Sequence, residues 1–200
     1  MPKFTDTEKE RIRLDMLHTA HQYFIAKGLK NTSIEEITSS VFIAKSSFYV
    51  FFESKEMLYL ELLALEGEEI ERRVWPKVEE KKDVREAIKV YLKEMSSELE
   101  SNILTRRLIT NLEEYKMVIR KVNPQYSATK TLRSIVPLMD FIKKNKELNY
   151  LIDDDVEIIA GVIRAALAMI IHKKDFGEEI YPKIQEVIFN AVANELTKGV

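Results

Sequence analysis

Apolar residues recur at every third or fourth position along almost the whole chain, which is the spacing of one face of an α-helix. Only five glycines and five prolines interrupt its 200 residues. No segment alternates convincingly between polar and apolar residues, as a half-buried strand would. The pattern therefore predicts an all-α protein.

Helix start and stop signals divide this pattern into about nine helices. Capping Ser and Thr residues mark expected starts, and Gly28 and Pro76 mark expected ends. Pro137 is expected to kink or divide the helix that contains it. The expected helices cover residues 6–27, 33–40, 44–50, 54–75, 83–99, 102–121, 128–146, 153–172 and 178–198.

Composition excludes several classes of protein. The chain has no cysteine, which rules out disulfides, zinc–thiolate sites and thiol catalysis. Its N-terminus is polar, and no stretch reaches the about 18 uninterrupted apolar residues of a membrane helix, so we expect a cytoplasmic protein without membrane contact. The net charge is −2, and residues 1–60 hold eight basic and eight acidic residues. Any basic surface for nucleic acid must therefore be local.

The segment 32–58 carries the most specific pattern. Thr32 with Glu35, and Ser33 with Glu36, each fit a capping box at the start of a short helix. A turn of three or four residues then leads to a second short helix over 44–50. Two short helices joined in this way are typical of a DNA-reading helix-turn-helix.

The second short helix has polar residues suited to DNA. Lys45, Ser46 and Ser47 lie at its N-terminal end, where lysine and serine can bond to base edges or phosphate. Tyr49 can offer its hydroxyl to a phosphate oxygen. Lys55 lies in the first turn of the next helix, where the helix dipole already favours an anion.

Residues 16–58 resemble the N-terminal domain of TetR-type regulators. The F-x-S-K-E-x-L ending, preceded by a tyrosine, is the most specific part of the match. The matching residues are Ala20, Phe24, Gly28, Thr32, Ser33, Ile37, Lys45, Phe48, Tyr49, Phe52, Ser54, Lys55, Glu56 and Leu58. The resemblance implies DNA contacts by Thr32, Lys45, Tyr49 and Lys55. With the neighbouring hydroxyls, the expected DNA-binding residues are Thr32, Ser33, Lys45, Ser46, Ser47, Tyr49 and Lys55.

The chain departs from the family pattern at the turn. Phe42 stands where the family often has glycine, and phenylalanine is strained there if the position needs a positive φ. Ala44 replaces a serine that would cap the second helix. Ser46 also differs from the usual glycine, so the base preference of this helix is open.

The resemblance also implies a homodimeric regulator, most often a repressor that a small-molecule ligand releases from its operator DNA. We expect a DNA-binding domain over 1–53 with its motif over about 33–52, a connecting helix over 54–75, and a ligand-binding and dimerisation domain over 76–200. Bulky, adaptable side chains are the candidate lining of a pocket for a largely hydrophobic ligand, with plain core as the alternative for each. They are Tyr91, Met95, Leu112, Tyr115, Met139 and Met169.

The segment 156–171 is apolar on more than one face, which predicts burial on two sides. Its small residues would allow a partner helix to approach closely, and the final helix has an apolar stripe to complete a two-fold, four-helix interface. The expected dimer contacts are Gly161, Ala165, Ala168, Ile184, Ile188 and Ala191. The alternative is a central core helix in a monomer.

No catalytic constellation is visible, so we expect neither an enzyme nor a cofactor. His18 and His21 have metal-ligand spacing, but no further ligand is near them in sequence, which favours packing or solvated roles. Two other classes stay open at this stage: a helical enzyme and a helical protein–protein adaptor without DNA binding.

Overall fold

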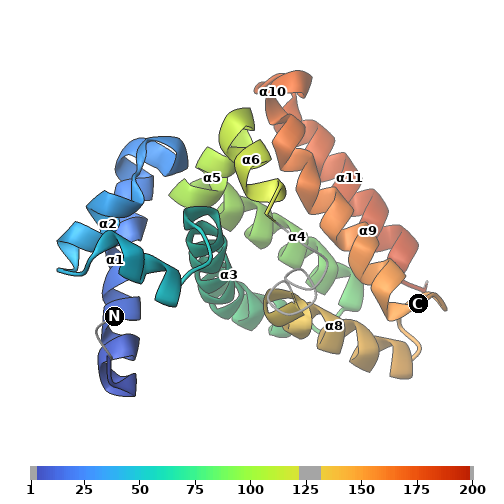
Figure 1. The fold of residues 1–200 in the computed structure, drawn as a ribbon. Coiled ribbons are helices and arrows are strands. Elements are labelled where there is room, and N and C mark those ends of the chain that lie inside the picture. The colour runs from blue at the N-terminus through green and yellow to red at the C-terminus, as the bar shows by residue number, and fades with distance from the viewer. Residues whose placement is uncertain (1–3, 122–131, 199–200) are drawn as a thin grey trace. The chain divides into compact units, whose positions relative to one another are not determined.

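The computed structural model describes residues 4–121 and 132–198 (Figure 1). These residues form ten α-helices and two 3₁₀-helices. Among them, β-pairing is limited to one isolated antiparallel bridge between Leu151 and Thr197. The all-α prediction is therefore confirmed. None of the described helices combines the length and hydropathy needed to cross a membrane.

The chain divides into two compact units. The first consists of residues 1–66 and 103–127, and the second of residues 67–102 and 128–200. The functional ranges expected from the sequence, 1–53, 54–75 and 76–200, stay predictions. The packing units fall elsewhere, because residues 103–121 pack with the N-terminal part of the chain.

The first unit is built around one apolar core. Its elements are α1 (Asp6–Asn31), α2 (Ile34–Ser40), the 3₁₀-helix η1 (Lys45–Val50), the first part of α3 (Lys55–Glu79), α5 (Ile103–Thr110) and α6 (Leu112–Ile119). Fully buried members of the core are Met16, Ala20, Phe24, Leu29, Ile37, Phe48, Leu58, Tyr59 and Leu104. The Tyr59 hydroxyl donates a 3.0 Å hydrogen bond to the carbonyl of Leu104, which ties α3 to α5.

Gly28 interrupts α1 without ending it. Its φ of +83° breaks the helical backbone, and a last turn then continues to Asn31. The break predicted at Gly28, with a positive φ, is thus confirmed, and one further turn follows it to Asn31. A Cβ at Gly28 would meet the side chains of Arg107 and Glu114, which form an ion pair with Nε 3.1 Å from Oε2. Glycine is required here for both its φ and its missing side chain.

The second unit has its own core. Its elements are the end of α3, α4 (Val84–Ser101), α8 (Leu132–Glu147), α9 (Val156–Ala168), the 3₁₀-helix η3 (Met169–His172), α10 (Lys173–Phe176) and α11 (Tyr181–Leu196). Figure 1 shows α9 and α11 side by side. Buried core members include Ile70, Val74, Ile88, Leu92, Leu138, Ile142, Ile159, Ile163, Ala193 and Leu196.

The end predicted at Pro76 is wrong, and so is a division at Pro137, whereas a kink at Pro137 stays a prediction. Helix α3 runs through Pro76 to Glu79, and the amide of Glu80 still bonds to the Pro76 carbonyl at 3.2 Å. Val74 and Val78 on either side of the proline are buried, and their burial offsets the lost backbone bond. Helix α8 is likewise undivided at Pro137 over its described residues.

Asn111 makes a break that the apolar pattern does not reveal. The expected helix over 102–121 is two helices, because Asn111 leaves the helical conformation and its side-chain oxygen accepts from the amides of Glu113 and Glu114, both at 3.2 Å. An N-cap of this kind starts α6 in a new direction within the same apolar pattern.

Candidate nucleic-acid interface

The two short helices of the first unit form a helical hairpin. Ser33 caps α2: its hydroxyl accepts from the Glu36 amide at 3.1 Å, and the Ser33 amide donates to the Glu36 carboxylate at 2.8 Å. The hydrogen bond from Lys27, followed by those from Ser33, lowers the pKa of Glu36 to about 2. Of the two capping boxes predicted, the Ser33–Glu36 pair is therefore the one that forms.

The turn between the two helices has an unusual backbone. Phe42 has a φ of +58°, so the position needs the left-handed conformation that favours glycine. Its side chain is 96% exposed and gains no burial in return. Ala44 begins η1 without a side-chain cap, as expected from the missing serine. A hydrogen bond of 3.0 Å from the Ile43 amide to the Thr38 carbonyl closes the turn.

The second short element is a 3₁₀-helix over Lys45–Val50. Phe48 and Phe52 are buried and fix it to the core of the first unit. Tyr49 is 60% exposed, and its ring lies edge-on to Phe48 with centroids 5.5 Å apart. The aromatic pair places one ring in the core and the next at the surface.

Four of the seven expected DNA-binding residues are exposed: Ser33, Lys45, Ser46 and Tyr49. Lys45 is 3.6 Å from Glu35, and both side chains remain mostly in solvent. Ion pairs of this kind are weak, so the Lys45 amine can exchange Glu35 for another anion.

The structure does not support side-chain contacts by the other two hydroxyls. Thr32 is 1% exposed, and its hydroxyl donates a 2.7 Å hydrogen bond to the Gly28 carbonyl at the end of α1. Ser47 is 4% exposed, because it shares the inward side of η1 with Phe48. These two expectations are corrected, since buried hydroxyls cannot reach nucleobases in this conformation.

A shallow depression of about 470 Å³ brings together three of the five remaining residues. Its lining includes Lys45, Tyr49 and Lys55 and also Lys121, which follows α6. Three amines and a phenol hydroxyl share this surface with the carboxylates of Glu53 and Glu56, so the depression offers cationic donors to a polyanion such as the DNA backbone without being uniformly positive. Lys121 was missed from the sequence, because no local pattern places it beside residues so far upstream.

Lys55 has a second role in this depression. Its amine donates to the main-chain carbonyls of Thr32 at 2.6 Å and Lys30 at 3.3 Å. Burial lowers the pKa of Lys55. An ammonium group has three donors, so one N–H is left for a phosphate.

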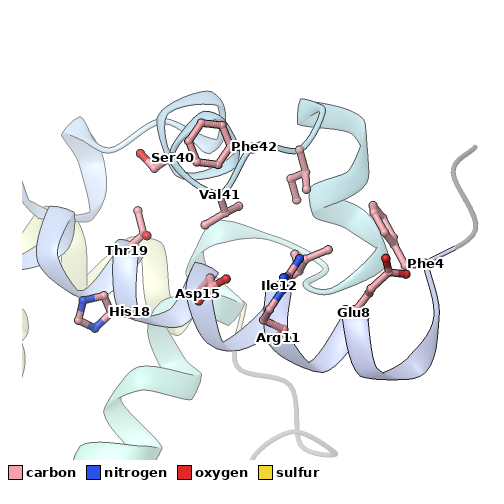
Figure 2. Close-up of a pocket in the computed structure, with 11 residues that line it drawn as sticks. Phe4, Glu8, Arg11, Ile12, Asp15, His18, Thr19, Ser40, Val41 and Phe42 are labelled. Atoms are coloured by element: carbon pink, nitrogen blue, oxygen red, sulfur yellow. The ribbon is translucent and has the colours of Figure 1, made fainter.

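A second groove, of about 540 Å³, runs between α1 and the turn (Figure 2). Figure 2 shows Ile12 and Asp15 on α1 below Val41 and Ser40 of the turn. Its lining includes acidic Glu8 and Asp15 and the basic Arg11, so it has fewer lysine and arginine side chains than the depression around Lys45.

The two histidines of α1 have protein partners. His21 lies 2.5 Å from the carboxylate of Glu66, and His18 lies 3.0 Å from the side chain of Gln22. Within the described residues, no three His, Asp or Glu side chains gather in a way that could hold a metal ion.

Residues 16–62, which include this hairpin, match the family model for bacterial regulatory proteins of the tetR family. The fold is similar to RolR solved with its ligand resorcinol (TM-score 0.69, 16% identity, 96% of this chain and 90% of that one). It is also similar to a TetR-family transcriptional regulator from Pectobacterium atrosepticum (TM-score 0.67, 18% identity, 96% and 94%). The family match thus covers the hairpin and the helices beside it, and over the rest of the chain the similarity is one of fold.

Two curated relatives come from Bacillus subtilis (strain 168). The uncharacterized HTH-type transcriptional regulator YuxN is 41% identical over 56 residues, which are 28% of this chain and 18% of YuxN. The uncharacterized HTH-type transcriptional regulator YxaF is 29% identical over 96 residues, 48% of this chain and 50% of YxaF. The aligned parts thus span half or less of each relative's length.

The expected ligand-pocket residues are divided between the two compact units. Tyr91 and Met95 are buried in the second unit, with Met139 packed against the same core and Met169 half-buried in η3. Leu112 is 64% exposed and Tyr115 half-buried, and both belong to the first unit. The new start of α6 at Asn111 turns Leu112 outward and Glu114 and Val118 inward, so the expectation for Leu112 is corrected.

Helices α9 and α11 of the TetR fold expose apolar side chains in the isolated chain. Ile158 is 51% and Val162 38% exposed on α9, and Val187 is 56% exposed on α11. The expected contacts Gly161, Ala165, Ala168 and Ala191 are exposed, whereas Ile184 and Ile188 are half-buried. We call the exposed residues of these two helices the α9–α11 face.

Proposed function

We propose that this chain is a sequence-specific, DNA-binding transcriptional regulator of the TetR family. One observation carries the proposal: Lys45, Tyr49 and Lys55 line the same depression, next to the exposed hydroxyl of Ser46 at the start of η1. In this arrangement Lys45 and Ser46 meet base edges in the major groove. Tyr49, Lys55 and Lys121 meet phosphate oxygens and set the register of the hairpin on the duplex.

The regulator acts as a homodimer through the α9–α11 face. Exposed apolar stripes on two adjacent helices favour a four-helix contact with a second copy, because an isolated chain would leave them in water. Two copies related by a two-fold axis present two η1 hairpins to half-sites one helical turn apart, about 34–36 Å.

A small-molecule effector releases the repressor from its operator DNA. The structure of RolR with resorcinol supports ligand binding within this fold. To shift the DNA-bound fraction from 99:1 to 1:99, an effector must bind the DNA-incompetent state about 10⁴-fold more tightly. We expect the protein to act in the cytoplasm and to have no enzymatic activity.

DNA binding is tested by selecting bound sequences from random duplex DNA and then measuring fluorescence anisotropy over a range of salt concentrations. We expect affinity to fall steeply with salt. Lys45→Met should change the preferred sequence, whereas Tyr49→Phe should weaken all duplexes alike. Lys174→Met, an exposed lysine in α10, is the matched control and should change neither. A folded dimer without salt-dependent duplex binding would contradict the proposal and indicate the helical adaptor instead.

The dimer is tested by light scattering after size exclusion. Val187→Glu places a charge on the α9–α11 face and should produce a monomer. Ile119→Glu is the control, since Ile119 is similarly exposed, at 48%, but lies on α6. A wild-type monomer at micromolar concentration, or equal effects of the two variants, would contradict this interface.

A further inference from the structure

Glu71 carries a carboxyl group buried in the second unit without a cationic partner. The residue is 6% exposed. The Tyr91 hydroxyl donates to Oε1 at 3.1 Å, but Oε2 has no hydrogen-bond partner within the described residues. Burial raises the pKa of Glu71 to about 7, and the hydrogen bond from Tyr91 and the nearby indole of Trp75 offset only part of that rise.

A carboxyl group in this position reduces the stability of the folded protein. Burying an ionisable group without full hydrogen bonding is unfavourable, and native proteins retain few such groups. The indole N–H of Trp75 is also buried and makes no hydrogen bond of good geometry within the described residues, although it lies close enough to Glu71 to help lower the pKa of that carboxyl group. Glu71 and Trp75 lie one turn apart on α3, so two unsatisfied polar groups share one place in an otherwise apolar core.

A cleft of about 690 Å³ adjoins this place. Trp75 and Phe141 line it, and the Trp75 ring packs 5.7 Å from the Phe141 ring and 5.2 Å from the Tyr91 ring, centroid to centroid. Its volume lies in the usual range for small-molecule sites. Trp75 therefore belongs both to the wall of the cleft and to the surroundings of Glu71.

The charges around such a site determine which ligands it binds. A carboxylate repels anions and attracts cations, and the faces of Trp and Tyr rings also attract cations. The rim of the cleft carries both signs, with Glu79 and Asp140 near Lys81, Lys82 and Lys144. The rim thus gives no strong preference for the charge of a ligand, and Glu71 is the group that favours a cation.

We propose that the second unit binds an aromatic organic cation, with the hydrophobic body in the cleft and the ammonium group against Oε2 of Glu71, beside the ring of Trp75. A side-chain rotation of Trp75 joins the cleft to the carboxyl group. The inference rests on the proposed regulator function, for which it names the chemical class of the effector.

Trp75 reports binding directly, because it is the only tryptophan in the chain. Its fluorescence is followed while the full-length protein is titrated with three probes of one carbon skeleton: 4-phenylbutylamine, which is cationic at pH 7.5, neutral 4-phenylbutan-1-ol and anionic 4-phenylbutanoate. We expect the amine to change the emission and to bind at least tenfold more tightly than the alcohol, with the carboxylate weakest. Equal affinities for amine and alcohol would overturn the proposal.

Two variants test which residue causes the preference for the amine over the alcohol. Glu71→Gln keeps the size of the side chain and should remove the tenfold preference while leaving the affinity for the alcohol unchanged. Glu79→Gln, on the same helix at the rim of the cleft, should keep the preference. A preference that survives in Glu71→Gln, or that disappears in Glu79→Gln, would overturn the assignment. Thermal melting of both variants verifies that they are folded.

Duplex binding is measured on the same samples, so that the two proposals fail separately. A protein that binds duplex DNA but shows no preference for the amine contradicts the effector class alone. A protein that prefers the amine but never binds duplex DNA contradicts the regulator proposal alone.

Discussion

The side-chain amine of Lys55 lies 2.6 Å from the main-chain oxygen of Thr32. This bond joins the start of α3 to the end of α1, and a second one to the Lys30 carbonyl strengthens the same link. Carbonyls at a helix C-terminus lack helical partners and carry partial negative charge, so a lysine amine stabilises them. Lys55 therefore holds the hairpin in place as well as facing the depression around Tyr49.

Lys55 and Lys121 should differ when each is replaced by methionine. Lys55→Met should lower the free energy of unfolding by roughly 1–2 kcal/mol, because two carbonyls lose a charged donor. Lys121→Met should leave stability unchanged, since Lys121 is exposed, and should reduce the slope of log affinity against log salt by about one unit. Urea unfolding and anisotropy titrations measure both quantities, and identical behaviour of the two variants would contradict the division of roles.

Gly28→Ala should be one of the most damaging single changes in the first unit. A methyl group there meets Arg107 and Glu114 and also forces alanine to a φ of +83°. We expect a loss of roughly 2–4 kcal/mol from strain and from displacement of the ion pair, of which Glu114 is buried.

Gly177→Ala separates the two causes. Gly177 has nearly the same φ, +88°, but an added Cβ would have only an ordinary contact at 3.8 Å with Ile180. Backbone strain alone should cost about 1–2 kcal/mol there. Equal losses for the two alanine variants in thermal or urea unfolding would mean that crowding at Gly28 contributes nothing.

Phe42→Gly should stabilise the protein, because Phe42 combines a φ of +58° with 96% exposure. Removal of the strained conformation should raise the free energy of unfolding by up to about 1 kcal/mol, once the greater flexibility of unfolded glycine is subtracted. Phe42→Ala removes the ring but keeps the strain, so it should be close to wild type. A Phe42→Gly variant less stable than Phe42→Ala in urea unfolding would show that the ring supports the fold.

Glu71→Gln should change the dependence of stability on pH. The folded pKa of Glu71, about 7, lies above its ordinary value of 4.5, so the wild type loses stability as pH rises through this window. Glutamine cannot ionise and escapes the loss, which is on the order of 3 kcal/mol for a shift of this size. The free-energy advantage of Glu71→Gln should therefore grow between pH 4.5 and 8 in urea unfolding, whereas Glu79→Gln should run parallel to the wild type. A constant difference between Glu71→Gln and the wild type would contradict the raised pKa.

Local signals in the sequence predicted much of the fold. Thr5 and Ser33 form capping boxes, and Ser54 accepts from the Met57 amide at 3.2 Å, because these bonds depend only on residues three positions apart. Residues expected to end or interrupt a helix were less reliable guides to the helix boundaries. Pro76 lies inside a helix whose flanking valines are buried, and Asn111 breaks one through its own side chain. Tertiary burial and side-chain capping both act outside the apolar pattern.

The candidate site was predictable where it is continuous in sequence. Lys45, Tyr49 and Lys55 were expected to lie together and do line one depression. Lys121 and Glu71 were not expected, since their importance depends on contacts with distant segments or on burial. Ser47 was misjudged because the inward side of a 3₁₀-helix differs from that of an α-helix at the same positions.

Leu104 and Val118 complete the core beneath the hairpin, although the chain has already passed through α3 and α4 before it reaches them. Exchange of modules between regulators is constrained as a result. A hybrid protein that joins residues 1–66 to the C-terminal part of another regulator would lack these two side chains. Its DNA-binding part would have a gap in the core, and the Tyr59 hydroxyl would lose its acceptor. The unit that would have to be transferred is discontinuous in sequence and includes α5 and α6. We therefore expect that a simple fusion near residue 66 does not transfer DNA specificity.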